Sequence, residues 1–158
     1  MIPAEATELM DAGRRMIGAV LEPHGFEYRP GSTGASSGGD FSSGEFVRGD
    51  RRLELHFRYS LGLVRYHIGS ASISHEDYMR HTGHRSEAKY PGFSSDPLDG
   101  FRHLADDLKA FGHDFVSGDG ASLLAAIKAA ASLANVSGLA RLNALDPSQH
   151  AARAPASE

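Results

Sequence analysis

Cysteine is absent from the 158 residues of this chain. Its absence excludes disulfides, zinc sites built on thiolates and a cysteine nucleophile. It also fits a reducing compartment, so we expect a cytoplasmic protein. No stretch approaches the ~18 consecutive apolar residues that a membrane span requires. The first residues include Glu5 and Glu8 and no uninterrupted apolar run, so we expect no secretory signal there.

An excess of basic charge is also lacking. Sixteen Lys and Arg residues face 20 Asp and Glu residues, which gives a formal net charge of −4. This balance argues against a broad nucleic-acid surface. The unusual feature is a content of nine histidines. One interpretation is a surface that tolerates histidine. The other is a metal site or an acid/base site, because neutral imidazole can bind a metal and can transfer a proton.

The N-terminal segment 4–22 has the apolar periodicity of a helix that buries one face. Pro23 and Gly25 are expected to end it. The stripe is formed by Ala6, Leu9, Met10, Gly13, Met16, Ile17, Val20 and Leu21. Beyond it, Phe26–Arg29 is predicted as a short strand, and the Gly- and Ser-rich run 30–40 as a flexible loop or the tip of a long hairpin.

The centre of the chain, Gly49–Gly69, alternates apolar and ionisable residues as half-buried strands do. Gly49-Asp50 is predicted to be a two-residue turn between a strand at Phe41–Arg48 and the strand that follows. The expected facing pairs are Arg48 with Arg51, Phe46 with Leu53, and Glu45 with Glu54. The expected core positions of the second strand are Leu53, Leu55, Phe57 and Tyr59.

The strand predicted at Val64–Ser70 leaves one question of register open. Its two faces carry Val64, Tyr66 and Ile68 on one side and Arg65 and His67 on the other. A three-residue loop with Gly62 in the left-handed region would place Arg65 opposite Phe57, on the wrong face. A bulge or a longer loop is needed to keep the apolar faces together.

The remaining segments are predicted to be helical. We expect a short helix at His75–His81 capped by Ser74, then a loop, then a helix that starts at Asp96-Pro97 and continues to Phe115. A last helix is expected at Ala121–Val136. The order indicates an α+β fold, an antiparallel meander of three or four strands with an N-terminal helix and two or three C-terminal helices packed on one face. Residues 1–136 would form a single domain, and 137–158 a partly helical and then disordered tail.

This layout resembles small uncharacterised bacterial α+β domains, some of them toxin-immunity-like. The resemblance rests on a helix that ends in His24-Gly25-Phe26, a meander with Gly49-Asp50-Arg51, and the loop Tyr90-Pro91-Gly92-Phe93 before a helix. It extends over residues 5–120 and carries over no catalytic residue. It implies a non-enzymatic intracellular protein that acts through a partner.

One cluster invites comparison with the zinc motif HExxH. The comparison fails because Met79 stands four residues after His75. Asp77 and His81 are one helical turn apart, and His84 could reach the same ion from the following loop. The alternative is a solvated helix end, where a cationic C-terminus suits the helix dipole.

The polar face of the predicted sheet is the second candidate. It carries Glu45, Glu54, His56, Arg58, Arg65 and His67. Charge there can simply keep a half-exposed sheet soluble. It can also bind a carboxylate or another anion through Arg58 and Arg65, or support acid/base chemistry through Glu54, His56 and His67. A further candidate is an exposed aromatic patch at Tyr90 and Phe93, unless these rings pack onto the core.

These features favour a non-enzymatic intracellular bacterial binding protein that uses its charged sheet face and needs no cofactor. Its partner is expected to be another protein, not a membrane or a nucleic acid, and a homodimer is left open. The alternative is a hydrolase that uses a His/Asp/Glu cluster, either with a divalent metal such as zinc or by acid/base catalysis.

Overall fold

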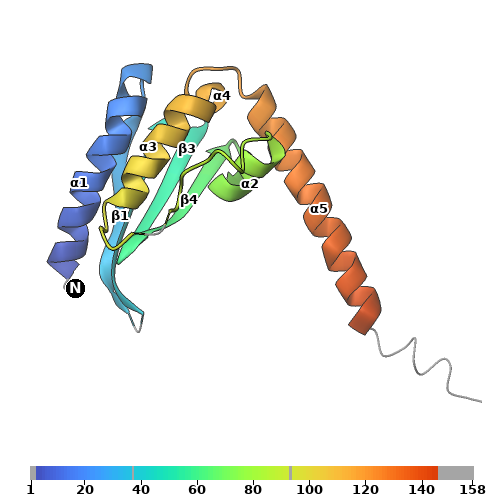
Figure 1. Ribbon diagram of the computed structural model, residues 1–158, viewed down its shortest axis with the longest axis horizontal. Helices are drawn as coiled ribbons and strands as arrows, with labels where there is room; N and C mark the ends of the chain where they lie inside the picture. Colours follow the sequence, from blue (N-terminus) through green and yellow to red (C-terminus); the bar gives the residue numbers. More distant parts are fainter. Residues whose placement is uncertain (1–2, 37, 93, 146–158) are drawn as a thin grey trace, which may run out of the picture.

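The computed structural model (Figure 1) describes residues 3–36, 38–92 and 94–145. One antiparallel sheet in the order β1-β2-β3-β4-β5 follows an N-terminal helix and precedes the other helices. The helices are α1 (Pro3–Leu21), the 3-10 turn η1 (Glu22–His24), α2 (His75–His81), α3 (Asp99–Phe111), α4 (His113–Val116) and α5 (Ala121–Leu145). The strands are β1 (Glu27–Ser36), β2 (Gly39–Arg48), β3 (Arg51–Arg58), β4 (Ser60–Ile68) and β5 (Ala71–Ser74). The α+β class is confirmed, but the sheet has five strands, not three or four.

Two segments account for the difference in strand number. β1 continues through most of the Gly- and Ser-rich run 30–40, with a register shift between Pro30 and Thr33. Of the two alternatives predicted for this run, the structure has the long hairpin and not the flexible loop, because pairing with β2 satisfies the backbone and β1 is an edge strand where a proline is tolerated. β5 has only four residues and follows a turn at Gly69, whose φ is +59°.

The β2–β3 hairpin has the predicted register. Arg48 lies opposite Arg51, Phe46 opposite Leu53, and Glu45 opposite Glu54. The repulsion between the two facing arginines is offset, because both guanidinium groups donate to main-chain carbonyls of α4. Arg48 Nη1 donates to the carbonyl of Val116 at 2.7 Å, and Arg51 Nη1 donates to that of Phe115 at 2.7 Å.

The β3–β4 hairpin contains the bulge that the apolar pattern required. The register shifts between His56 and Phe57, so that Leu53 faces Tyr66 and Glu54 faces Arg65. The prediction that Tyr59 lies in the core is wrong. Tyr59 sits in the turn with φ +65° and is 56% exposed, because the strand alternation ends one residue earlier.

The helices bury one face of the sheet. Figure 1 shows α1 and α3 against it. All five α-helices contribute buried side chains to the same cluster as Leu53, Leu55 and Phe57. The contact between α1 and α3 is close at Gly13, where a Cβ atom would lie 2.2 Å from the ring of Phe101. Among the described elements, the opposite face of the sheet is therefore left without a covering helix.

The C-terminal helices differ from prediction in their bounds. The helix expected from Asp96 to Phe115 is interrupted at Gly112, and its regular part begins at Asp99, after a turn in which Asp96 Oδ1 accepts from the Leu98 amide. α2 has the predicted bounds, and its cap Ser74 accepts from the Asp77 amide.

α5 continues past Val136 to Leu145, into the segment predicted to be partly helical, and runs away from the sheet in Figure 1. Residues 146–158, most of the predicted tail, lie outside the described residues. In the part of the chain that the structure describes, no helix has the length and apolar character to cross a membrane.

Candidate functional site

The uncovered face of the sheet, here called the outer face, carries the polar residues singled out in the sequence. Burial alternates along β2 and β3. The odd-numbered residues of β2 and the even-numbered residues of β3 therefore lie on this side. The outer-face side chains of β1 to β4 include Arg29, Phe41, Glu45, Arg52, Glu54, His56, Arg58, Leu63, Arg65 and His67. The bulge at His56 keeps Arg65 and His67 on the same side as Glu54, so the charged surface is contiguous.

One row of charges crosses four strands. Arg29 is paired with Glu45, Glu45 with Glu54, and Glu54 with Arg65 in the strand register. Two adjacent glutamates would repel each other if they were the only charges present. The repulsion is relieved by cations from the neighbouring row.

Each of these two glutamates has a diagonal partner on the outer face. Arg52 Nη1 lies 2.7 Å from Glu45 Oε2, and His67 Nε2 lies 2.8 Å from Glu54 Oε1. The glutamates and Arg52 are partly open to solvent, and exposed pairs of this kind contribute about 0–1 kcal/mol to stability. The charge pattern therefore contributes little to holding the sheet together.

The two arginines expected to share an anion do not converge. The guanidinium of Arg58 lies over the ring of Phe41, 5.7 Å from its centroid, on β2. Arg65 instead donates from Nε to Ser72 Oγ at 3.0 Å, towards β5. The strand register separates their Cα atoms by roughly 14 Å. The two side chains are therefore too far apart to bind one small anion together.

The acid/base set is brought together only in part. Glu54 and His67 are hydrogen-bonded, but His56 turns towards β2, where its ring stacks on Phe41 with centroids 5.4 Å apart. A shallow hollow of about 210 Å³ lies beside Glu54 at the irregular part of β1. It is smaller than the ~300–1,000 Å³ usual for small-molecule pockets.

The residues proposed as metal ligands do not form a site together. Asp77 makes an ion pair with Arg80, and the ring of His84 stacks on Phe111 with centroids 4.4 Å apart. In residues 3–36, 38–92 and 94–145, no group of three or more His, Asp or Glu side chains is placed to hold an ion. His81 Nε2 and His84 Nδ1 are buried and have no hydrogen-bond partner among the described residues.

The predicted aromatic patch is not formed at Tyr90. This side chain is buried, and its hydroxyl donates to the carbonyl of Leu61 at 2.7 Å. The ring packs edge-on against His75 at 5.4 Å. Phe93, the other residue of the predicted patch, lies outside the described residues. Tyr90 therefore anchors its loop to the core.

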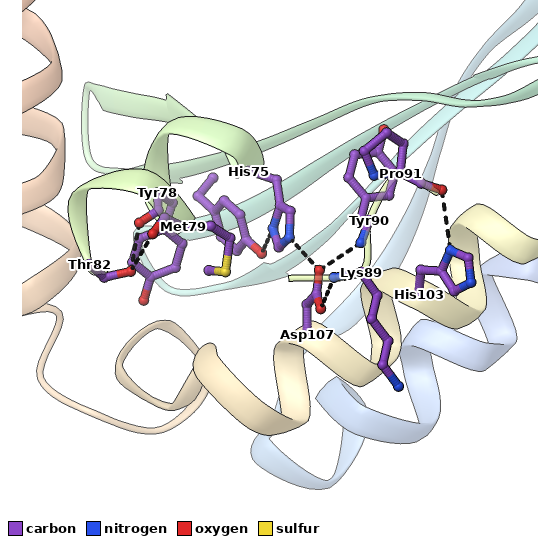
Figure 2. Close-up of polar contacts among 10 residues, drawn as sticks. His75, Tyr78, Met79, Thr82, Lys89, Tyr90, Pro91, His103 and Asp107 are labelled. Carbon is purple, nitrogen blue, oxygen red and sulfur yellow. Dashed lines mark hydrogen bonds and ion pairs between the residues drawn. The ribbon is translucent and has the colours of Figure 1, made fainter. Parts of the chain in front are cut away.

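A buried relay of Tyr66, His75 and Asp107 was not predicted from the sequence. His75 Nδ1 lies 2.8 Å from the Tyr66 hydroxyl, and His75 Nε2 lies 2.9 Å from Asp107 Oδ2. Figure 2 shows His75 and Asp107 with the backbone amides of Lys89 and Tyr90, which donate to Asp107 at 2.7 and 2.9 Å. A neutral imidazole with its proton on Nε2 satisfies the whole chain, because it donates to the carboxylate and accepts from the hydroxyl.

The relay has the order hydroxyl, imidazole, carboxylate, which is also the order of a hydrolytic triad. Its hydroxyl, however, is sealed, since Tyr66 is 0% exposed and His75 and Asp107 are each 1% exposed. Burial raises the pKa of Tyr66 well above its usual value, so the phenol stays protonated. Burial alone would raise the pKa of Asp107, but hydrogen bonds from His75, Lys89 and Tyr90 outweigh it and lower that pKa. The relay is a polar clamp that ties β4, α2 and α3 to the loop before α3.

Another hollow lies beside this loop and has a volume of about 600 Å³. Its lining includes three carboxylates, those of Glu76, Asp96 and Asp99. Asp96 and Asp99 both make ion pairs with Arg102. One arginine therefore offsets the charge of one of these two carboxylates, and the hollow keeps an acidic lining.

Fold and surface together define an α+β domain with a five-stranded antiparallel sheet that is covered on one side and charged on the other. No protein-family model, no curated protein and no solved structure matches this chain.

Proposed function

We propose that this chain is a non-enzymatic binding protein that recognises another protein through its outer face. One observation carries the proposal. A contiguous face across four strands is left without a covering helix in the described residues, yet it has an ordered charge pattern that adds little stability. Ordered charge that fixes orientation and rejects wrong partners is typical of recognition surfaces.

The resemblance to bacterial domains that act through a partner supports the same proposal, and so does the intracellular setting expected from the lack of cysteine. The outer face combines cations, carboxylates and histidines. Such a mixed surface suits a protein partner, which can present complementary charges one by one. It suits a phosphate backbone less well, because a backbone presents one sign of charge throughout.

Site-specific photo-crosslinking tests this proposal. A photoreactive phenylalanine analogue replaces Leu63 on the outer face, or Leu124 on α5 as the control. These leucines are matched in exposure, at 40% and 45%. The full-length chain is illuminated in a lysate of its own organism, and each crosslinked protein is identified and then tested with purified components.

We expect one protein to crosslink from position 63 and not from 124, and to bind again when both components are pure. Crosslinking from 124 alone, or from neither position, would overturn the proposal.

The acid/base hydrolase remains the second candidate, favoured by one contact, that between His67 Nε2 and Glu54 Oε1 at 2.8 Å. A carboxylate can orient a histidine as a general base in this way. Purified protein and the His67→Gln variant would be compared on ester, phosphoester and glycoside substrates. Turnover that is lost in His67→Gln would support the hydrolase and count against the binding proposal.

A further inference from the structure

Aromatic and apolar side chains gather at one end of the outer face, around the β3–β4 turn. We call this group, formed by Phe41, His56, Arg58, Tyr59 and Leu63, the aromatic corner. Tyr59 and Leu63 are 56% and 40% exposed, and they are two of the four large apolar side chains exposed in the described part of the chain. Elsewhere the outer face is charged, so the corner is its apolar end.

The aromatic corner is ordered by contacts among its own members. The rings of Phe41 and His56 stack with an interplanar angle of 13°, and the guanidinium of Arg58 lies over the same Phe41 ring. Leu63 is the register partner of His56 on the neighbouring strand. Arginine and aromatic residues in such contact are the residue types that dominate binding energy at protein interfaces.

Tyr59 has a backbone conformation that disfavours its own side chain. Its φ is +65°, and it is the only non-glycine residue with positive φ among those described. Glycine or asparagine would adopt this conformation with less strain. A bulky residue held in such a region indicates a use for its side chain. The ring also lies over the β1–β2 turn, where a Cβ atom at Gly39 would come within 2.1 Å of the Tyr59 hydroxyl.

The charges around the corner indicate the chemistry of the partner. Glu45 and Glu54 are already paired with Arg52 and His67. Arg65 donates from Nε to Ser72 and makes no ion pair within the described residues, although Glu54 is its register partner. Cationic charge is therefore left over on this face, beside the apolar corner.

Building on the proposed function, we propose that the aromatic corner is the anchor of the outer face and binds an acidic protein segment that carries apolar side chains. Tyr59 and Leu63 pack against the apolar side chains of that segment, and Arg65 pairs with a carboxylate. Single-stranded nucleic acid could also stack on such rings. It is disfavoured because its continuous phosphates would run along Glu45 and Glu54, whereas a peptide can place its carboxylates beside the arginines alone.

Selection from a phage-displayed random peptide library against the full-length chain tests this inference. Selected peptides are synthesised and titrated against the wild type, Tyr59→Asn, and Leu133→Ser as a control. Leu133 is similarly exposed, at 54%, but lies on α5. Asparagine tolerates positive φ, so the variant removes the ring without adding backbone strain, and its melting temperature should match or exceed that of the wild type.

We expect acidic peptides with aromatic or large aliphatic residues, bound about thirtyfold or more weakly by Tyr59→Asn and equally well by Leu133→Ser. Peptides that compete with the crosslinked partner but are unaffected by Tyr59→Asn would overturn this inference and leave the proposed function standing. Selection of basic peptides would also overturn the inference. So would single-stranded oligothymidylate that binds more tightly than the selected peptides and depends on Tyr59. If the binding of the selected peptides depends on no outer-face residue, the result would count against both this inference and the proposed function.

Discussion

The Nε2 atom of His75 lies 2.9 Å from Oδ2 of Asp107, and both side chains are closed to solvent. This contact joins the first residue of α2 to the buried side of α3. Asp107 also accepts hydrogen bonds from the backbone amides of Lys89 and Tyr90, so one carboxylate fixes the loop between the two helices. The interior of the domain is thus organised by polar contacts as well as by apolar packing.

Replacement of Asp107 should destabilise the domain strongly. In Asp107→Asn the side-chain NH2 group faces either the Lys89 backbone amide or both His75 Nε2 and the Tyr90 backbone amide, so at least one buried donor is left unsatisfied. We expect a loss of about 2–4 kcal/mol in the free energy of unfolding. Urea denaturation measures it. Asp106→Asn is the control, since Asp106 is exposed and pairs only with Lys89, and a similar loss in both variants would contradict the clamp.

Acid should weaken the domain through the same carboxylate. The pKa of Asp107 is lowered in the folded state from its ordinary value of 3.8. Its contribution to stability is therefore present above pH 3.8 and is lost as the pH falls below it towards the folded pKa. Unfolding free energies measured between neutral and acid pH should show this fall in the wild type and a smaller one in Asp107→Asn. An equal fall in both would contradict the assignment.

Alkali should weaken the domain through its buried phenols. Burial raises the pKa of Tyr78 from 10.0 to about 12. The unfolded chain therefore loses this proton before the folded one, and stability falls as the pH rises from 10 towards 12. In Tyr78→Phe the fall over this interval should be smaller. Tyrosinate absorbance followed during alkaline titration of the folded protein should show late ionisation, and early ionisation of every tyrosine would contradict it.

Arg51 should hold the segment between α3 and α5 in place. Its guanidinium donates to the carbonyls of Asp114, Phe115 and Gly118. Arg51→Met removes these bonds, and we expect a loss of about 2–3 kcal/mol together with faster amide exchange in α4. The control is Arg52→Met on the outer face, where we expect a change of about 0–1 kcal/mol. Equal effects at both positions would contradict the role given to Arg51.

The close packing of α1 on α3 should exclude any side chain at Gly13. A Cβ atom there would lie 2.2 Å from the ring of Phe101, so Gly13→Ala should cost about 1–3 kcal/mol. Gly62→Ala is the matched control, because its nearest neighbouring atom would be 4.0 Å away. Thermal unfolding of both variants checks this. A tolerated alanine at Gly13 would show that the helices are further apart than described.

The sequence predicted what local periodicity controls. The Gly49-Asp50 turn and its facing pairs followed from the alternation and the turn residues, and so did α2 with its Ser74 cap. The failures, and the alternatives left open, lie where tertiary contacts decide. The strand through residues 30–36 depends on pairing with β2, and the exposure of Tyr59 depends on where a one-residue turn falls.

The clamp was missed because its members are far apart in the sequence. Tyr66, His75 and Asp107 belong to three different elements, and only the fold brings them together. One signal was present. Asp107 lies on the apolar stripe of its helix, next to Leu104 and Leu108, and a carboxylate at such a position needs a buried partner. The outer face, in contrast, could be predicted as a set of residues but not as a contiguous surface until the bulge at His56 was known.

The central claim is that the outer face binds a partner protein, and the most direct test is the affinity of the purified crosslinked partner for two charge-reversal variants. Arg65→Glu reverses a charge on the outer face, and Arg15→Glu reverses one on the exposed side of α1. We expect Arg65→Glu to weaken binding about tenfold or more and Arg15→Glu to leave the affinity within about twofold of the wild type. Equal affinity of Arg65→Glu and the wild type, or a loss confined to Arg15→Glu, would contradict the claim.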